Sequence, residues 1–141
     1  MEVPSLSGET EEQRPPDVLL DGKRVLVVDD DARNVFALAS ALEQHGIEVV
    51  YAESGETGIA SLRRETDLAA VLMDVMMPGM DGYTAIREIR RISAFADLPI
   101  IALTAKAMPG DRENSLEAGA SDYVTKPVDV GHLLEVLREW A

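Results

Sequence analysis

An uninterrupted apolar run, Ala69–Met73, ends at one aspartate, Asp74, and is followed by a Met-, Pro- and Gly-containing segment that closes at Gly82. A run without polar residues is typical of a strand buried on both faces, as in a parallel sheet covered by helices. The Pro78–Gly79 pair predicts a turn before the next helix. Asp74 is then either a ligand-binding residue at a strand end or a carboxylate that caps a turn.

Four further short runs predict strands, and amphipathic segments predict helices between them. The predicted strands are 24–28, 47–52, 69–74, 98–103 and 122–125. Apolar residues recur at i, i+3, i+4 and i+7 in two of the helical segments, at Val35, Leu38, Ala39 and Leu42 and at Val130, Leu133, Leu134 and Leu137. Ile86 and Ile89 are expected to face the core, with Arg87, Glu88, Arg90 and Arg91 facing outward.

Residues at the predicted helix ends agree with these boundaries. Ser54 is expected to cap a helix that carries Ile59 and Leu62 inward, and Gly46 is expected to stop the helix before it. Pro109 is expected to begin a later helix and Gly119 to end it. Strands alternating with helices over short connections predict an α/β, doubly wound parallel sheet with helices on both faces.

The first 22 residues differ from the rest of the chain. They are polar and acidic, include the pair Pro15–Pro16 and show no sustained periodicity. We expect residues 1–22 to be a flexible tail or linker, with Val18, Leu19 and Leu20 docking weakly on a single domain that spans residues 23–141.

Composition excludes several classes of function. A net charge of −13 argues against contact with nucleic acid or an anionic membrane through this domain, since both need basic patches. The absence of cysteine excludes disulfides, thiolate chemistry and Cys-ligated zinc. No apolar run approaches the roughly 20 residues that span a bilayer, and the polar N-terminus does not resemble a signal peptide. A cytoplasmic location is therefore expected.

Chemically useful side chains lie where the predicted strands end. They are Asp29 and Asp30 after the first strand, Asp74 after the third, Thr104 after the fourth and Lys126 after the fifth. In a doubly wound sheet neighbouring strand ends share one crevice. Carboxylates held close together repel one another unless a cation joins them, and Mg²⁺ prefers such oxygen ligands. The backbone carbonyl of Met76 can add a further ligand.

This set of residues suits phosphoryl transfer. Asp74 can act as a nucleophile, because aspartyl phosphates are established covalent intermediates. Mg²⁺ and Lys126 can neutralise the phosphoryl oxygens, and the Thr104 hydroxyl can donate a hydrogen bond to one of them.

Four segments together resemble the receiver domain of two-component response regulators: VLVVDDD, VLMDVMMPGMDG, IIALTA and DYVTKP. The resemblance covers about residues 23–141 and implies a flavodoxin-like fold with strand order 2-1-3-4-5. It implies a phosphoacceptor at Asp74, a metal-binding pair at Asp29 and Asp30, a phosphoryl-sensing hydroxyl at Thr104 and a phosphate-pairing lysine at Lys126. It also implies a cis Lys126–Pro127 bond.

The resemblance further implies a function and a partner. The expected function is a phosphorylation-controlled switch that takes a phosphoryl group from a histidine kinase or a histidine phosphotransfer protein. The domain catalyses its own phosphorylation and autodephosphorylation, as a monomer or weak dimer. Tyr123 is either a switch residue that moves when Thr104 is drawn to the phosphoryl group or an ordinary half-buried aromatic residue. The segments DDDARNVFAL and LTAKAMPGDRENSLEAGASDYVTKPVD are most similar to receivers of hybrid sensor histidine kinases, and a free-standing regulator is the alternative.

Two other functions are possible for such a chain, and several residues have alternative roles. An aspartate-nucleophile phosphohydrolase would place a second aspartate two residues after the nucleophile, where this chain has Met76. A docking domain that is never phosphorylated has no chemical need for the complete set of polar residues. Asp31 is expected to cap a helix rather than bind metal. Met76, Met77 and Met80 are either an adaptable partner surface or loop packing. An apolar Met76, with Lys106 two residues after Thr104, predicts slow to moderate autodephosphorylation.

Overall fold

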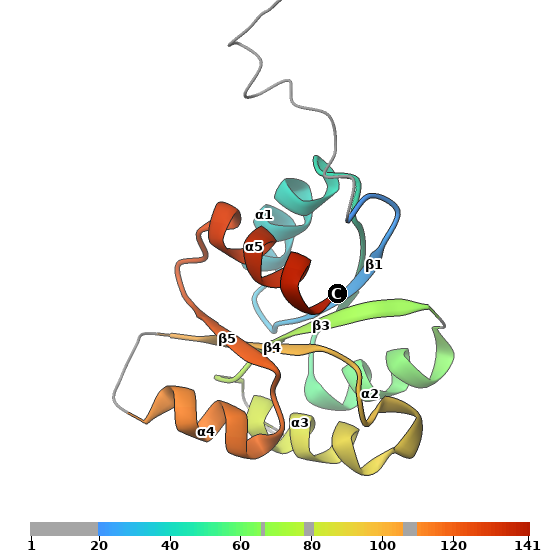
Figure 1. The fold of residues 1–141 in the computed structure, drawn as a ribbon, viewed down its shortest axis with the longest axis vertical. Helices are drawn as coiled ribbons and strands as arrows, with labels where there is room; N and C mark the ends of the chain where they lie inside the picture. The colour runs from blue at the N-terminus through green and yellow to red at the C-terminus, as the bar shows by residue number, and fades with distance from the viewer. Residues whose placement is uncertain (1–19, 66, 78–80, 106–109) are drawn as a thin grey trace, which may run out of the picture.

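The computed structural model describes residues 20–65, 67–77, 81–105 and 110–141. Strands and helices alternate along the chain, with a short 3-10 helix before β4 (Figure 1). The strands are β1 (Arg24–Val28), β2 (Glu48–Ala52), β3 (Leu68–Asp74), β4 (Ile100–Thr104) and β5 (Asp122–Thr125). The helices are α1 (Ala32–Glu43), α2 (Gly55–Arg64), α3 (Gly82–Arg91), η2 (Ser93–Phe95), α4 (Asp111–Ala118) and α5 (Val130–Trp140).

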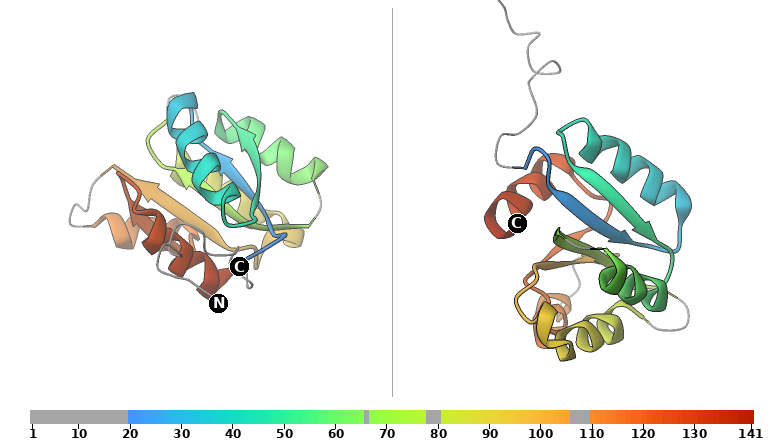
Figure 2. Two further views of the ribbon diagram at one scale, coloured as in Figure 1. Left: turned by 90° about the horizontal axis from the view of Figure 1, so that it is seen from above. Right: turned by 90° about the vertical axis from the view of Figure 1, so that its right-hand side faces the viewer.

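The five strands form one sheet in the order β2-β1-β3-β4-β5, and every neighbouring pair is parallel. Helices α1 and α5 cover one face, whereas α2, α3 and α4 cover the other (Figures 1 and 2). The predicted doubly wound fold and its strand order are confirmed. Because the strands are parallel, the carboxyl ends of all five lie on the same side of the domain, which we call the exit end of the sheet. Their amino ends lie on the opposite side, which we call the entry end.

The pleat of the central strands divides the core into two layers. In β1, Val25 and Val27 pack in the core cluster that includes residues of α1 and α5, while Leu26 and Val28 pack in the cluster that includes residues of α2 and α3. Successive strand residues point to opposite faces, so a strand buried on both sides needs apolar residues at consecutive positions. The unbroken apolar runs in the sequence are explained by this double burial.

The helix caps agree with the sequence patterns. Asp31 caps α1 by accepting a hydrogen bond from the backbone N–H of Arg33, so its predicted capping role is confirmed. Ser54 and Thr57 form a reciprocal capping box at the start of α2. Gly119 ends α4 with φ of 117°, a left-handed conformation that glycine adopts without steric cost.

Some element boundaries differ from the predictions. Strand β4 begins at Ile100 rather than at Leu98, because Pro99 has no N–H to donate to a neighbouring strand. Strand β2 begins at Glu48, one residue later than expected. The expected helix start at Pro109 lies outside the described residues.

Arg90 corrects the prediction that it faces solvent. Its guanidinium turns toward the entry end of the sheet, where Nη1 donates to the carbonyls of Leu98 at 2.7 Å and Phe95 at 2.8 Å. Its Nε donates to the carbonyl of Gly119 at 2.8 Å, and its Nη2 lies 3.4 Å from the Ser121 hydroxyl. We call this group of five residues the Arg90 clamp. Its charge suggested the outer face, but position 90 lies four residues after the inward-facing Ile86, and the carbonyls of the surrounding turns accept hydrogen bonds from its side chain.

Of the segment expected to be a tail, the structure describes residues 20–22. Leu20 is 2% exposed and belongs to the core cluster shared by α1 and α5. Its carbonyl accepts a hydrogen bond from Lys23 N at 3.0 Å, which closes a turn into β1. Val18 and Leu19 lie outside the described residues, and the boundary at residue 22 stays a prediction. None of the helices in the described part of the chain is long and apolar enough to cross a membrane.

Candidate metal centre

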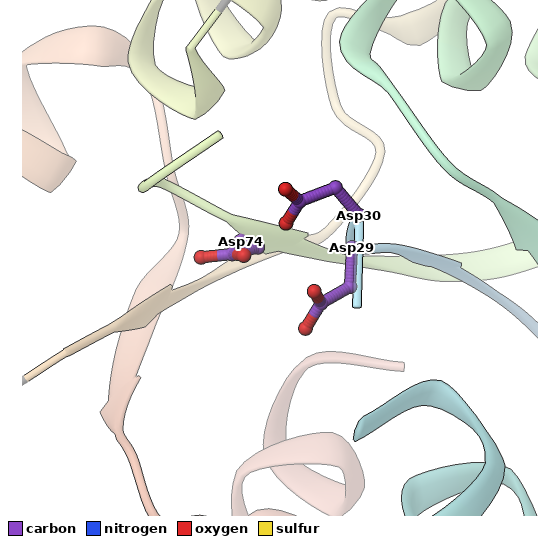
Figure 3. A group of neighbouring side chains, drawn as sticks. All are labelled: Asp29, Asp30 and Asp74. Carbon is purple, nitrogen blue, oxygen red and sulfur yellow. The ribbon is translucent and has the colours of Figure 1, made fainter. Parts of the chain in front are cut away.

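Three carboxylates gather at the exit end of the sheet, as the sequence predicts. Asp29 and Asp30 follow β1 and Asp74 ends β3, and the three side chains project into one region (Figure 3). One carboxylate oxygen from each residue can be chosen so that all three lie within 4.8 Å of one another. Asp29 and Asp74 are 2% and 3% exposed, whereas Asp30 is exposed, so the cluster is open to solvent on one side.

The backbone brings these residues together because β1 and β3 are neighbours. Val28 pairs with Met73, the residue before Asp74. The chain then passes close to the start of α3. A Cβ on Gly82 would lie 2.3 Å from the carbonyl oxygen of Asp74, so only glycine fits where α3 approaches the end of β3.

Lys126 is the cation that the described part of the chain brings to this site. Its Nζ lies 3.2 Å from Asp74 Oδ2 and 3.3 Å from Asp29 Oδ2. Its backbone N–H donates to the Thr104 carbonyl at 2.7 Å, which ties the end of β5 to the end of β4. The Lys126–Pro127 peptide bond is cis, as the resemblance implies.

Burial and neighbouring groups shift the pKa of Asp74 in opposite directions. Burial raises the pKa of the Asp74 carboxyl above its ordinary value, and the charge of Asp29 adds to this effect. The backbone N–H of Met76, at 3.0 Å from Asp74 Oδ1, and the ammonium of Lys126 act in the opposite direction. Among the described residues, the Lys126 ammonium pairs with two of the three carboxylates, Asp29 and Asp74, so a second cation would relieve the remaining repulsion.

The donor set fits magnesium. Carboxylate oxygens at two strand ends, with an open side that leaves room for water, match the preference of Mg²⁺ for a few carboxylates and several waters. Asp29, Asp30 and Asp74 are the residues that would hold the ion. A contribution from the carbonyl of Met76 stays a prediction.

Thr104 ends β4 beside this cluster. Its side chain is 1% exposed, and its hydroxyl has no hydrogen-bond partner among the residues that the structure describes. A buried hydroxyl without a partner costs free energy. Such a group is explained when its partner is a ligand that arrives later.

The other residues predicted to belong to the site or its surface differ in how far they are buried. Tyr123 is half-buried and packs against the core cluster of α2 and α3, which leaves both interpretations of this residue open. Met77 is buried, whereas Met76 is 68% exposed. The two methionines therefore divide between loop packing and accessible surface. Met80 and Lys106 lie outside the described residues.

Sequence reasoning missed two features near this site. A groove of about 260 Å³ runs between α1 and the segment after β5, with Asp29 and Lys126 at its polar side. Its other side is apolar and includes Leu38, Leu103 and Val130. Phe36 of α1 is 75% exposed. Large apolar side chains on a helix suggest burial, and nothing in the local sequence marks Phe36 as the exception.

The comparisons with known proteins agree with this geometry. The family model described as the response regulator receiver domain matches residues 25–138. The sensor protein GacS of Pseudomonas syringae pv. syringae is 43% identical over an alignment of 121 positions, and the match covers 83% of this chain and 13% of GacS. The protein PilH of Pseudomonas aeruginosa is 39% identical over 114 residues, or 81% of this chain and 93% of PilH.

Solved structures of receiver domains are also similar to this chain. One is the receiver domain of a sensor histidine kinase from Pseudomonas aeruginosa PAO1 with a magnesium ion coordinated in its active site cleft. It is 39% identical, has a TM-score of 0.78, and the match covers 84% of this chain and 97% of that one. Another is a complex of the Saccharomyces cerevisiae histidine phosphotransfer protein Ypd1 with the receiver domain of the response regulator Ssk1. The match has 28% identity and a TM-score of 0.79, and it covers 86% and 90% of the two chains.

Proposed function

This chain belongs to the response regulator receiver family, whose members are phosphorelay switches of two-component signalling, and from this premise we propose that Asp74 is the residue that accepts the phosphoryl group. The observation that carries the proposal is the position of Asp74. It is a buried carboxylate whose two oxygens already face a backbone N–H and an ammonium, beside two further carboxylates and a hydroxyl without a partner.

The proposed donor is the phosphohistidine of a partner protein. An Asp74 carboxylate oxygen attacks phosphorus, an O–P bond forms, and the N–P bond to the imidazole breaks. The electron pair of that bond stays on the imidazole nitrogen, which takes up a proton. Lys126 Nζ, at 3.2 Å from Asp74 Oδ2, is placed to pair with the phosphoryl oxygens. The Thr104 hydroxyl, which has no partner among the described residues, gains a hydrogen bond to a phosphoryl oxygen in the product.

Receiver domains bind Mg²⁺ at an acidic pocket, and this chain has such a carboxylate cluster. We propose that Asp29, Asp30 and Asp74 hold the ion here. When bound, Mg²⁺ supplies positive charge that stabilises the phosphoryl oxygens. The relative with a magnesium ion in its cleft supports this assignment.

A protein donor agrees with the surface around Asp74. Phe36 and Met76 are 75% and 68% exposed, and they belong to segments that begin at the acidic strand ends. The groove beside Lys126 has an apolar side formed in part by Leu38 and Val130. A donor that brings a histidine to Asp74 must cover this surface, and apolar contacts would hold it there.

The domain fits two kinds of protein, a hybrid histidine kinase and a free-standing regulator. We propose that it is the receiver of a hybrid histidine kinase, since it spans 13% of GacS, a sensor protein. A free-standing regulator remains the alternative, because the chain spans 93% of PilH. In either setting we place the domain in the cytoplasm. The added charge on Asp74 would bias a two-state element formed by Thr104, Tyr123 and the α4–α5 side of the domain.

Intact mass after incubation with acetyl phosphate tests the proposal. The wild-type chain should gain the mass of one phosphoryl group with Mg²⁺ and none with EDTA. The Asp74→Asn variant should gain none in either condition. The matched control is Asp31→Asn, which removes a neighbouring carboxylate that caps α1 and keeps a side chain able to cap.

The result separates the acceptor from its neighbours. Asp31→Asn should be phosphorylated like the wild type. Phosphorylation of Asp74→Asn at the same rate would show that another residue is the acceptor. If acetyl phosphate gives no gain, the same experiment with a phosphorylated histidine phosphotransfer protein decides, and failure there would exclude the proposed function.

A further inference from the structure

The Arg90 clamp lies at the entry end of the sheet, far along β4 and β5 from the phosphoacceptor. The Arg90 guanidinium reaches the two turns through which the chain enters these strands. Its bonds to the carbonyls of Phe95 and Leu98 hold the turn before β4, and its bond to the Gly119 carbonyl holds the turn before β5. One side chain therefore fixes both strand entries relative to α3.

Ser121 extends this connection into the sheet. Its hydroxyl lies 3.4 Å from Arg90 Nη2 and accepts a hydrogen bond from Ile100 N at 3.2 Å. Its own N–H donates to the Ile100 carbonyl at 2.7 Å. Ile100 is the first residue of β4, and Ser121 directly precedes β5. The two strands are thus joined at the point where their pairing begins.

The pairing of β4 with β5 decides where two residues of the proposed site lie. From this start the register runs to Thr104 opposite Thr125, and Lys126 N then donates to the Thr104 carbonyl. A one-residue slip moves a strand by roughly 3.3 Å and turns its side chains to the opposite face. Because β5 has 4 residues, its own ladder resists such a slip weakly.

We infer that the Arg90 clamp is a positioning device for phosphoryl transfer. It holds β4 and β5 in the register that presents the Thr104 hydroxyl and the Lys126 ammonium to a phosphoryl group on Asp74. The inference rests on the proposed function. The hydrogen bonds of Arg90 reach the turns before β4 and β5, whereas Asp29 and Asp30 follow β1 and Asp74 ends β3. We therefore expect the clamp to govern phosphoryl acceptance and to leave magnesium affinity unchanged.

A purely structural role of Arg90 predicts a different experimental result. If Arg90 only stabilises the fold, its loss lowers the unfolding temperature and leaves the reaction of the folded molecules unchanged. Any other core substitution of equal cost would then have the same consequences. Leu42→Ala is the matched control, since Leu42 is fully buried on α1, in the other core layer.

The experiment compares wild type, Arg90→Met, Arg90→Lys, Ser121→Ala and Leu42→Ala as full chains, at a temperature where each is folded by circular dichroism. Magnesium affinity is measured by calorimetric titration. The rate of phosphorylation by acetyl phosphate is measured at saturating magnesium. Arg90→Met should lower the rate about tenfold or more, the effect of a small misplacement of reacting groups. Arg90→Lys and Ser121→Ala should show smaller decreases.

Magnesium affinity should stay within about twofold of the wild type in all of these variants, and Leu42→Ala should keep the wild-type rate. Wild-type rates in Arg90→Met and Ser121→Ala would overturn the inference, as would an equal loss of rate in Leu42→Ala. If Arg90→Met does not fold, Arg90→Lys and Ser121→Ala decide by the same criteria. A wild-type chain that accepts no phosphoryl group from acetyl phosphate or from a phosphorylated phosphotransfer protein would overturn the proposed function as well.

Discussion

The two ends of the sheet differ in how their charged groups are paired. At the entry end, Arg90 donates to several carbonyls, and Arg24 is paired with Glu65 at 2.8 Å. At the exit end, Asp29 and Asp74 of the carboxylate cluster share the ammonium of Lys126, and a buried hydroxyl has no partner among the described residues. The two arginines of the entry end have partners within the chain, whereas the proposed function completes the exit end with a cation and a phosphoryl group.

This difference separates stability from function within one fold. Satisfied polar groups stabilise the native state and fix its geometry. Unbalanced charges cost stability, and they persist where function requires them. The comparison predicts that substitutions at the entry end destabilise the protein, while substitutions at the exit end stabilise the metal-free protein and abolish its chemistry.

The largest effect on stability is expected from Arg90→Met. The substitution removes the Arg90 hydrogen bonds from several partly buried carbonyls, at roughly 1 kcal/mol for each. The free energy of unfolding in urea should fall by about 3 kcal/mol. The control is Arg87→Met on the exposed side of α3, which should change stability by less than about 0.5 kcal/mol. Equal effects of the two substitutions would remove the contrast between the ends.

Asp74→Asn should have the opposite sign. Because burial and Asp29 raise the pKa of Asp74, its ionised form destabilises the fold at neutral pH. In EDTA the variant should be more stable by roughly 1 kcal/mol, the usual size of a single substitution. Saturating Mg²⁺, about 100 times its dissociation constant, should stabilise the wild type by about 2.7 kcal/mol and the variant by less. A variant that is less stable in EDTA would contradict the view that the exit end is strained.

Two buried hydroxyls sharpen the comparison, since both Thr104 and Ser115 lack a partner among the described residues. Replacing either by an apolar residue of similar shape should raise stability by about 0.5 kcal/mol, because the cost of an unpaired buried group disappears. Thr104→Val should in addition slow phosphorylation severalfold, whereas Ser115→Ala should not. Thermal unfolding and the mass assay give both results. A slower reaction in Ser115→Ala would show that the orphan hydroxyl of α4 also takes part.

The smallest effect concerns acid stability at the entry end. The hydrogen bond from Arg24 lowers the pKa of Glu65 below its ordinary value. The pair therefore contributes stability above the ordinary glutamate pKa of about 4.3, and this contribution is lost as pH falls through the lowered folded-state pKa. In Glu65→Gln the unfolding temperature should fall less steeply in that range. Glu113→Gln, at an exposed position of α4, should keep the wild-type slope.

Local pattern predicted most of the fold. Apolar runs and helical stripes predicted the order and type of the elements, because strand and helix periods differ and doubly buried strands need consecutive apolar residues. The motif set also predicted the strand order through its resemblance to receivers. Boundaries such as the start of β4 shifted by one or two residues, since pairing depends on which N–H groups have a partner across the sheet.

The sequence alone determined which side chains lie at the strand ends, because the order and type of the strands and helices follow from local pattern. Tertiary structure decided how those groups interact. It brought the carboxylates within reach of one another, left Thr104 without a partner in the described region, and turned Arg90 inward. The fate of Arg90 depends on carbonyls 5 to 29 residues away along the chain. These carbonyls all lie beyond the end of α3 at Arg91, so the pattern of residues within the helix carries no information about them.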